Sequence, residues 1–250
     1  MADPVFLEEL FLSLQGEGAE VGRPQFFLRL GGCPLRCRYC DTPESWTTRA
    51  RFRVHAVGGC REQANPLPAV ELLPLFQDLA AGFGQALEGA CLAVTGGEPL
   101  AQAEFLAEWL PAWPGPRMLE TAGIWPQRLE RLLPLLDSVS LDWKLESTLD
   151  RGAELLDPAG CVELLERRGT RYWVKLVLTE RVEDQELAAA LAALERRAPG
   201  AQVYLQPATA GFGGVRPPGA ERLLRWSLLH RGRHLDLRVL PQVHPLLGAL

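Results

Sequence analysis

The stretch FFLRLGGCPLRCRYCDT, residues 26–42, places a cysteine-rich loop directly after an apolar run. Residues 26–30 combine aromatic and aliphatic side chains as a buried strand does, and Gly31 and Gly32 mark its end. Three thiols then follow with the spacing C-x3-C-x2-C, at Cys33, Cys37 and Cys40. The stretch therefore predicts a strand that delivers a metal-binding loop.

Outward from this stretch, β-rich runs alternate with longer runs of helical periodicity. We expect strands at 26–30, 91–95, 117–120, 138–143, 172–178, 202–206 and 235–240, and helices at 69–85, 101–109, 127–136, 183–197 and 221–230. This order predicts an α/β fold, a partial and open TIM-like (β/α)6 barrel. Without a linker or a break in composition, residues 1–250 are expected to form one domain, with an irregular excursion at 47–68 that contains a short strand at 51–54.

The composition is that of an ordinary folded chain, with 47 % hydrophobic and 23 % charged residues. The 26 basic and 31 acidic residues give a net charge of -5, which disfavours nucleic acid and anionic membranes and favours a small-molecule partner. No run approaches the ~20 apolar residues of a membrane span, and the acidic start differs from a secretory signal. We therefore expect a cytoplasmic protein with reduced cysteines.

Three thiolates leave one iron of a [4Fe-4S] cluster open to a chelating ligand, whereas ferredoxin clusters usually have four cysteines. A structural zinc site is the alternative, with Cys60 or His55 as fourth ligand, although the sequence has no second C-x2-C or H-x3-H pair. A redox pair of Cys37 and Cys40 would leave Cys33 unexplained. The remaining two cysteines are expected in the core: Cys91 and Cys161.

The motif C-x3-C-x-aromatic-C, with Tyr39 before its last cysteine, resembles the signature of the radical S-adenosylmethionine enzymes. The resemblance implies a [4Fe-4S] cluster on the three loop cysteines, S-adenosylmethionine on its open iron, and Tyr39 near the adenine. The segment 95–99, TGGEP, is similar to the GGEP motif of that superfamily. Gly96 and Gly97 let backbone groups approach a ligand closely, and Glu98 can accept a hydrogen bond from an ammonium group.

Polar residues also follow the later expected strands, where sites of β/α barrels gather. By the same resemblance they contact the ribose, methionyl and adenine parts of S-adenosylmethionine: Thr121, Asp142, Trp143, Lys144, Gln206, Pro207, Ala208 and Thr209.

The N-terminal segment strongly resembles the 7-carboxy-7-deazaguanine synthase family, through LSLQGEG at 12–18, GRP at 22–24, FLRLGGC at 27–33 and CDT at 40–42. The C-terminal PQVH at 241–244 is similar to the ending of that family. The resemblance implies a lyase that contracts 6-carboxy-5,6,7,8-tetrahydropterin to 7-carboxy-7-deazaguanine and ammonia, in queuosine-type 7-deazapurine biosynthesis. It also implies Mg2+, a homodimer, and an electron donor such as flavodoxin or ferredoxin.

The same resemblance gives substrate contacts to Leu14, Gln15, Gly16, Glu17, Arg29, Thr95, His244 and the carboxylate of Leu250. The Gln15 amide suits the donors and acceptors of a pterin, and Arg29 suits its carboxylate, although Arg29 paired with an acid such as Glu17 is the alternative. Thr42 matches the magnesium ligand of the family, with a turn cap beside Asp41 as the alternative. No general acid or base is assigned.

Three features depart from the family pattern: Ala122, Pro245, and the long segment 43–89. Ala122 puts one S-adenosylmethionine contact in doubt and Pro245 one substrate contact. The alternative functions are an activase that installs a glycyl radical on a partner protein and a zinc-stabilised binding module.

Overall fold

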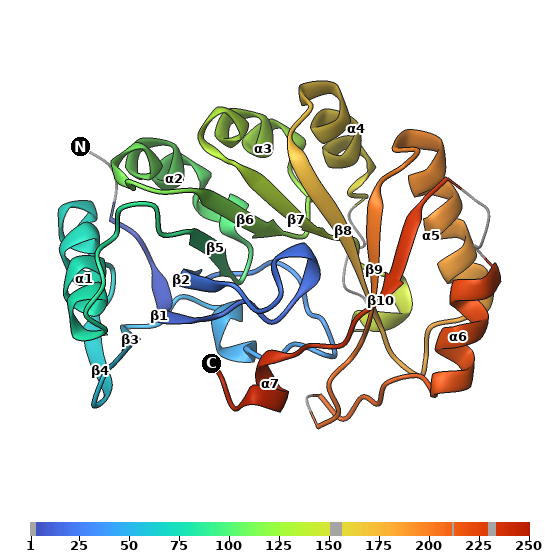
Figure 1. Ribbon diagram of the computed structural model, residues 1–250, viewed down its shortest axis with the longest axis horizontal. Helices are drawn as coiled ribbons and strands as arrows, with labels where there is room; N and C mark the ends of the chain where they lie inside the picture. Colours follow the sequence, from blue (N-terminus) through green and yellow to red (C-terminus); the bar gives the residue numbers. More distant parts are fainter. Residues whose placement is uncertain (1–3, 151–156, 212, 230–233) are drawn as a thin grey trace.

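The computed structural model describes residues 4–150, 157–211, 213–229 and 234–250, which contain a sheet of ten strands (Figure 1). The strand order is β10-β9-β8-β7-β6-β5-β2-β1-β3-β4. The strands are β1 (Leu7–Leu14), β2 (Pro24–Leu30), β3 (Arg51–Ala56), β4 (Gly59–Ala64), β5 (Leu92–Gly96), β6 (Arg117–Thr121), β7 (Ser138–Asp142), β8 (Arg171–Leu178), β9 (Gln202–Pro207) and β10 (Asp236–Val239).

Strands β2 and β5 to β10 are parallel neighbours, and helices connect them along the outer side of the curved sheet (Figure 1). The helices are α1 (Ala69–Gly82), α2 (Ala103–Trp109), α3 (Pro126–Leu132), α4 (Ala159–Arg168), α5 (Asp184–Arg197), α6 (Ala220–Leu229) and the short α7 (His244–Leu247). Each expected strand is present within two residues of its expected ends, so the predicted (β/α)6 architecture is confirmed. Residue 230, the expected end of α6, lies outside the described residues.

The N-terminal part of the sheet differs from the expectation. The segment 47–68 contains the hairpin of β3 and β4 rather than an irregular excursion, and β3 pairs in parallel with β1. Strand β1 was not expected at all. A register shift between Leu7 and Glu9 interrupts its alternation, so the buried Glu8 falls where the pattern requires an exposed side chain.

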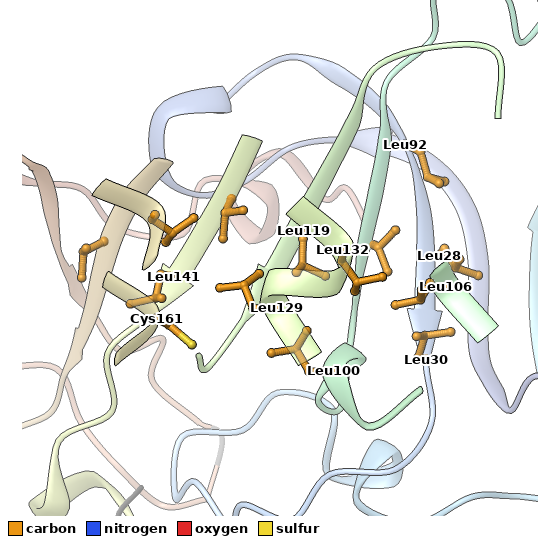
Figure 2. Close-up of a cluster of buried hydrophobic side chains, with 14 of the residues drawn as sticks. Leu28, Leu30, Leu92, Leu100, Leu106, Leu119, Leu129, Leu132, Leu141 and Cys161 are labelled. Carbon is orange, nitrogen blue, oxygen red and sulfur yellow. The ribbon is translucent and has the colours of Figure 1, made fainter. Parts of the chain in front are cut away.

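The two faces of the sheet have different roles. Leucines of the outer face pack against the helices, as Leu119 and Leu141 do near Leu129 and Leu132 of α3 (Figure 2). Cys161 lies fully buried in this core, as the sequence predicts. Burial of each such leucine contributes about 1.5–3 kcal/mol to stability. None of the helices in the described part of the chain has the length and apolar character needed to cross a membrane.

The inner face begins with an apolar floor and continues with polar side chains. The floor is a cluster of Phe11, Phe27, Ala93, Met118, Trp173 and Tyr204. Successive residues of a strand point to opposite faces, so the next inward position lies two residues further toward the carboxyl end. Those positions hold Arg29, Thr95, Glu120, Lys175 and Gln206. This alternation gives the barrel a floor and a polar layer above it.

Candidate active site

A cavity opens above the apolar floor, at the carboxyl ends of the parallel strands. The structure brings most of the predicted site residues to its wall. They are Leu14, Gln15, Gly16, Glu17, Arg29, Cys33, Cys37, Tyr39, Cys40, Thr95, Gly96, Gly97, Thr121, Asp142, Lys144, Gln206, Ala208, Thr209, His244 and Leu250.

Four predicted site residues lie outside this wall: Thr42, Glu98, Trp143 and Pro207. The Glu98 carboxylate is buried and accepts hydrogen bonds from Thr121 Oγ1 (2.6 Å) and from the backbone N–H groups of Ala122 (2.8 Å) and Leu100 (3.0 Å). Glu98 therefore ties the end of β5 to the end of β6. Trp143 packs in the outer core, Pro207 ends β9, and Thr42 accepts a hydrogen bond from Arg29 Nη1 (3.2 Å).

The cysteine loop is fixed mainly by hydrogen bonds to its backbone. Arg36 Nη1 donates to the carbonyl oxygens of Cys33 and Leu35, both at 2.8 Å, and the Cys40 N–H donates to the Cys37 carbonyl at 3.1 Å. Apolar side chains surround the thiols, and burial raises the pKa of Cys33 to about 11 and that of Cys37 and Cys40 as well. Metal binding must therefore displace protons from these thiols.

This donor set fits an iron–sulfur cluster, because soft thiolates select such clusters and all three thiols face one cavity. Within the described residues, no three His, Cys, Asp or Glu side chains are grouped to hold a single metal ion. His55 and Cys60, the residues expected to complete a zinc site, face each other across the β3–β4 hairpin, and His55 Nε2 lies 3.2 Å from Glu9 Oε1.

A buried ion network crosses the cavity wall from β8 to the cysteine loop. Lys175 Nζ bonds Glu17 and lies 3.4 Å from Asp142 Oδ2. The same Asp142 oxygen lies 2.6 Å from Lys144 Nζ, which also donates to the Tyr39 hydroxyl at 3.0 Å. Burial opposes ionisation of Glu17, but Lys175 outweighs it and lowers the pKa of Glu17 to about 2. The network thus places fixed charges along the cavity wall between β8 and the cysteine loop.

The Gln15 amide is occupied by the protein itself. Its Nε2 donates to Glu120 Oε1 (2.8 Å) and Gln25 Oε1 (3.1 Å), and its Oε1 accepts from the Glu17 N–H (3.1 Å). Gln15 therefore holds the Glu120 side chain and the backbone of Glu17 in place. Arg29 pairs with an acid, as the alternative interpretation expected, but the acid is Glu9, at 3.2 Å, and not Glu17.

The C-terminal segment covers the cavity beside β1. The Val243 N–H donates to the Gly16 carbonyl at 2.9 Å, and Gln242 Nε2 donates to Glu17 Oε1 at 2.6 Å. The His244 ring packs so closely on Gly16 that a Cβ there would lie 2.1 Å from its Nδ1. Gly16 and His244, two predicted substrate contacts from opposite ends of the sequence, therefore lie next to each other.

Comparison with known proteins identifies the family. The 7-carboxy-7-deazaguanine synthase of Methanopyrus kandleri is 39 % identical over 251 residues, covering 95 % of this chain and 91 % of the relative. This chain belongs to the 7-carboxy-7-deazaguanine synthase family. The enzyme of that name from Geobacter sulfurreducens is 31 % identical over 262 residues, covering 98 % of this chain and 97 % of the relative. No protein-family model matches the chain.

Solved structures agree with this family in fold. QueE from Escherichia coli has a TM-score of 0.58 at 21 % identity and covers 94 % of this chain and 93 % of its own. Streptococcus suis SuiB bound to S-adenosylmethionine has a TM-score of 0.54 at 14 % identity and covers 83 % of this chain and 48 % of its own. The likeness confirms the partial TIM barrel of the radical S-adenosylmethionine enzymes.

The predicted site leaves out several polar residues of the cavity wall, among them Glu120, Lys175 and Gln242. A usable signal existed for Lys175, because a lysine inside the apolar run 171–178 needs a buried anionic partner. Glu120 offered a similar signal at an inward position of β6. Gln242 lies in the C-terminal PQVH segment noted in the sequence, but its contacts with Glu17 and Asp41 join segments far apart in sequence and could not be predicted.

Gly97 is required by the approach of the cysteine loop. A Cβ at this position would lie 2.3 Å from the Gly32 carbonyl oxygen and 2.8 Å from that of Ser45. We expect Gly97→Ala to cost about 1–3 kcal/mol, as overpacking does, and to lower iron incorporation. Thermal unfolding and iron analysis after anaerobic reconstitution measure both effects. Gly219→Ala is the control, because nothing lies within 4 Å of its Cβ position; equal iron content in the two variants would contradict the prediction.

Proposed function

We propose that this chain catalyses the radical ring contraction of 6-carboxy-5,6,7,8-tetrahydropterin to 7-carboxy-7-deazaguanine, with loss of ammonia, in the biosynthesis of queuosine-type 7-deazapurines. The observation that carries the proposal is one cavity in which three cysteines of a single loop face the polar inner layer of the barrel. Relatives with the name of this activity match at 39 % and 31 % identity over nearly the whole chain.

Cys33, Cys37 and Cys40 would hold the [4Fe-4S] cluster, and the neighbouring strand ends would hold S-adenosylmethionine. When bound, these groups supply a carbon radical that abstracts a hydrogen atom. Two buried acceptors support a ligand beside them, because Asp142 Oδ1 and Gln206 Oε1 have no hydrogen-bond partner within the described residues. Buried polar atoms are normally paired, so ribose hydroxyls or ring N–H groups are suitable donors for them.

The substrate would lie deeper, over the apolar floor. Arg29 supports binding of its carboxylate, since the Arg29 guanidinium borders the cavity. Backbone groups of Leu14 and Gly16 would contact the pterin. Gln15 would orient the Glu120 side chain, and His244 and Leu250 would cover the bound substrate. Mg2+ would take Thr42, the substrate carboxylate and waters, because it usually keeps several waters. A homodimer and a flavodoxin or ferredoxin donor remain part of the proposal.

Arg29→Met is expected to raise KM for the substrate about 10- to 100-fold, because a hydrogen bond to a charged group contributes about 1.5–3 kcal/mol. Steady-state kinetics at several substrate concentrations measure the change. Arg53→Met is the control, since Arg53 also pairs with Glu9, at 2.7 Å, but does not border the cavity. An unchanged KM in Arg29→Met would remove Arg29 from the substrate site.

The function is tested by anaerobic incubation of reconstituted protein with dithionite, S-adenosylmethionine, Mg2+ and the pterin, followed by mass spectrometry. We expect 7-carboxy-7-deazaguanine and ammonia in equal amounts. Cleavage of S-adenosylmethionine without this product would support the activase alternative. A colourless zinc protein would support the binding module.

A further inference from the structure

The acidic side chains of the cavity wall differ in their partners. Glu17 bonds Lys175, and Asp142 lies within 3.4 Å of both Lys144 and Lys175. Both acids are therefore neutralised by buried cations. Asp41, the third, lies at the exposed rim of the wall and accepts hydrogen bonds from Thr42 and Gln242.

Glu120 also accepts hydrogen bonds from neutral donors, but unlike Asp41 it lies inside the cavity wall and not at the exposed rim. Its Oε1 accepts from Gln15 Nε2 at 2.8 Å and its Oε2 accepts from Thr95 Oγ1 at 2.9 Å. Among the described residues it makes no ion pair. Each carboxylate oxygen keeps a free lone pair after these bonds, because a carboxylate accepts about four hydrogen bonds in all.

The two environments separate the acids chemically. Burial raises the pKa of Glu120 and outweighs the nearby Lys175 charge, which lowers it, whereas the direct bond to Lys175 holds the pKa of Glu17 at about 2. A carboxylate stabilised by a lysine is a weak base, and one that is desolvated among neutral donors accepts a proton more readily. Two neighbouring acids whose environments shift their pKa values in opposite directions are candidates for distinct acid and base roles.

We infer that Glu120 is the catalytic base and acid of the elimination that ends the ring contraction, an inference that rests on the proposed function. The Glu120 carboxylate takes a proton from a carbon of the contracted ring, and the electron pair of that C–H bond becomes a ring double bond. The adjacent C–N bond breaks, its electron pair leaves with the amine, and the Glu120 proton passes to that amine. One proton moves from carbon to nitrogen, ammonia leaves, and no oxidant is consumed.

Gln15 and Thr95 act as positioning residues in this inference. Gln15 directly follows β1 and Thr95 lies on β5, both on one side of β6, and each bonds a different carboxylate oxygen. The carboxylate plane is therefore fixed toward the cavity. This role also explains why the Gln15 amide bonds other protein groups and is not free to bind the substrate.

Glu120→Gln tests the inference, because the amide keeps the shape and removes the base. We expect product formation to fall about 10²- to 10⁴-fold, the usual contribution of a general base. Transfer of deuterium from C6 of the labelled pterin into S-adenosylmethionine should persist, because that step precedes the elimination. A species with the mass of the substrate, still containing the amine nitrogen, should accumulate in acid-quenched samples.

Two variants complete the test. Glu120→Asp keeps the carboxylate and should form product at least about 10-fold faster than Glu120→Gln. Glu186→Gln is the matched control, since within the described part of the chain Glu186 also accepts from neutral donors, the Ser147 N–H and hydroxyl, but lies outside the cavity wall. Product formation by Glu120→Gln at the wild-type rate, or parallel loss of deuterium transfer and product, would overturn the inference. Failure of the wild-type chain to form product would instead overturn the proposed function.

Discussion

Replacing Lys175 with methionine is expected to lower the free energy of unfolding by about 3–5 kcal/mol, because the change leaves the buried Glu17 carboxylate without its cation. Lys175 is 7 % exposed and bonds Glu17, with Asp142 at 3.4 Å. Methionine preserves most of the side-chain volume, so the loss of stability measures the removal of the charge and not the creation of a cavity. Denaturant unfolding at pH 7 measures it.

The effect of Lys175→Met depends on pH in a defined direction. In the wild-type protein the pKa of Glu17 is lowered from 4.5 to about 2, so its stabilisation is present above pH 4.5 and is lost as pH falls toward 2. In the variant, burial without a cation raises the pKa of Glu17, so protonation relieves the penalty as pH falls. The stability gap should therefore narrow between pH 7 and pH 4.

Two controls separate this pair from ordinary surface charge. Arg51→Met breaks the pair of Arg51 and Glu62, both 60 % exposed in their side chains, and should cost about 0–1 kcal/mol. The double variant Lys175→Met, Glu17→Gln should recover part of the loss, because the unpaired charge is gone. Equal losses in Lys175→Met and Arg51→Met would show that Lys175 does not neutralise the cavity acids.

Cys37→Ala is expected to abolish both iron–sulfur absorbance and product formation. Cys37 is 8 % exposed, and its backbone bridges to Leu149, so the loop loses a ligand without losing its framework. Two remaining thiols cannot hold a cluster that normally needs at least three cysteines here. Absorbance and iron analysis after anaerobic reconstitution measure the first effect, and mass spectrometry measures the second.

Cys60→Ala is the matched control for the cysteine loop. Cys60 is exposed on the β3–β4 hairpin and does not line the cavity. This variant should keep wild-type iron content and product formation. Loss of iron in Cys60→Ala but not in Cys37→Ala would favour a metal site at the hairpin and contradict the assignment of the loop.

The repeated strands and helices were predictable because local patterns determine them. The apolar runs of β2 and β5 to β9 are largely buried, so each is typical of a strand without reference to the rest of the chain. The cysteine loop was likewise predictable, since all three thiols lie within eight residues. Its position at a strand end followed from the fold.

Long-range partners were not predictable from local patterns. The sequence shows Glu98 and Gln15 as polar residues in motifs, but only the folded chain shows that Glu98 bonds the β6 end and that Gln15 bonds Glu120. Strand β1 escaped prediction because its bulge places Glu8 inside the protein. Glu120 gained a role only when its neutral hydrogen-bond donors were compared with the Lys175 partner of Glu17.

Pterin deuterated at C6 gives the most direct test that cluster, cofactor and substrate share one cavity. Wild-type protein is incubated anaerobically with this substrate, and both 7-carboxy-7-deazaguanine and recovered S-adenosylmethionine are analysed by mass spectrometry. We expect the product together with deuterium in S-adenosylmethionine. Absence of product and of deuterium transfer, from protein with a full cluster content, would contradict the proposed function.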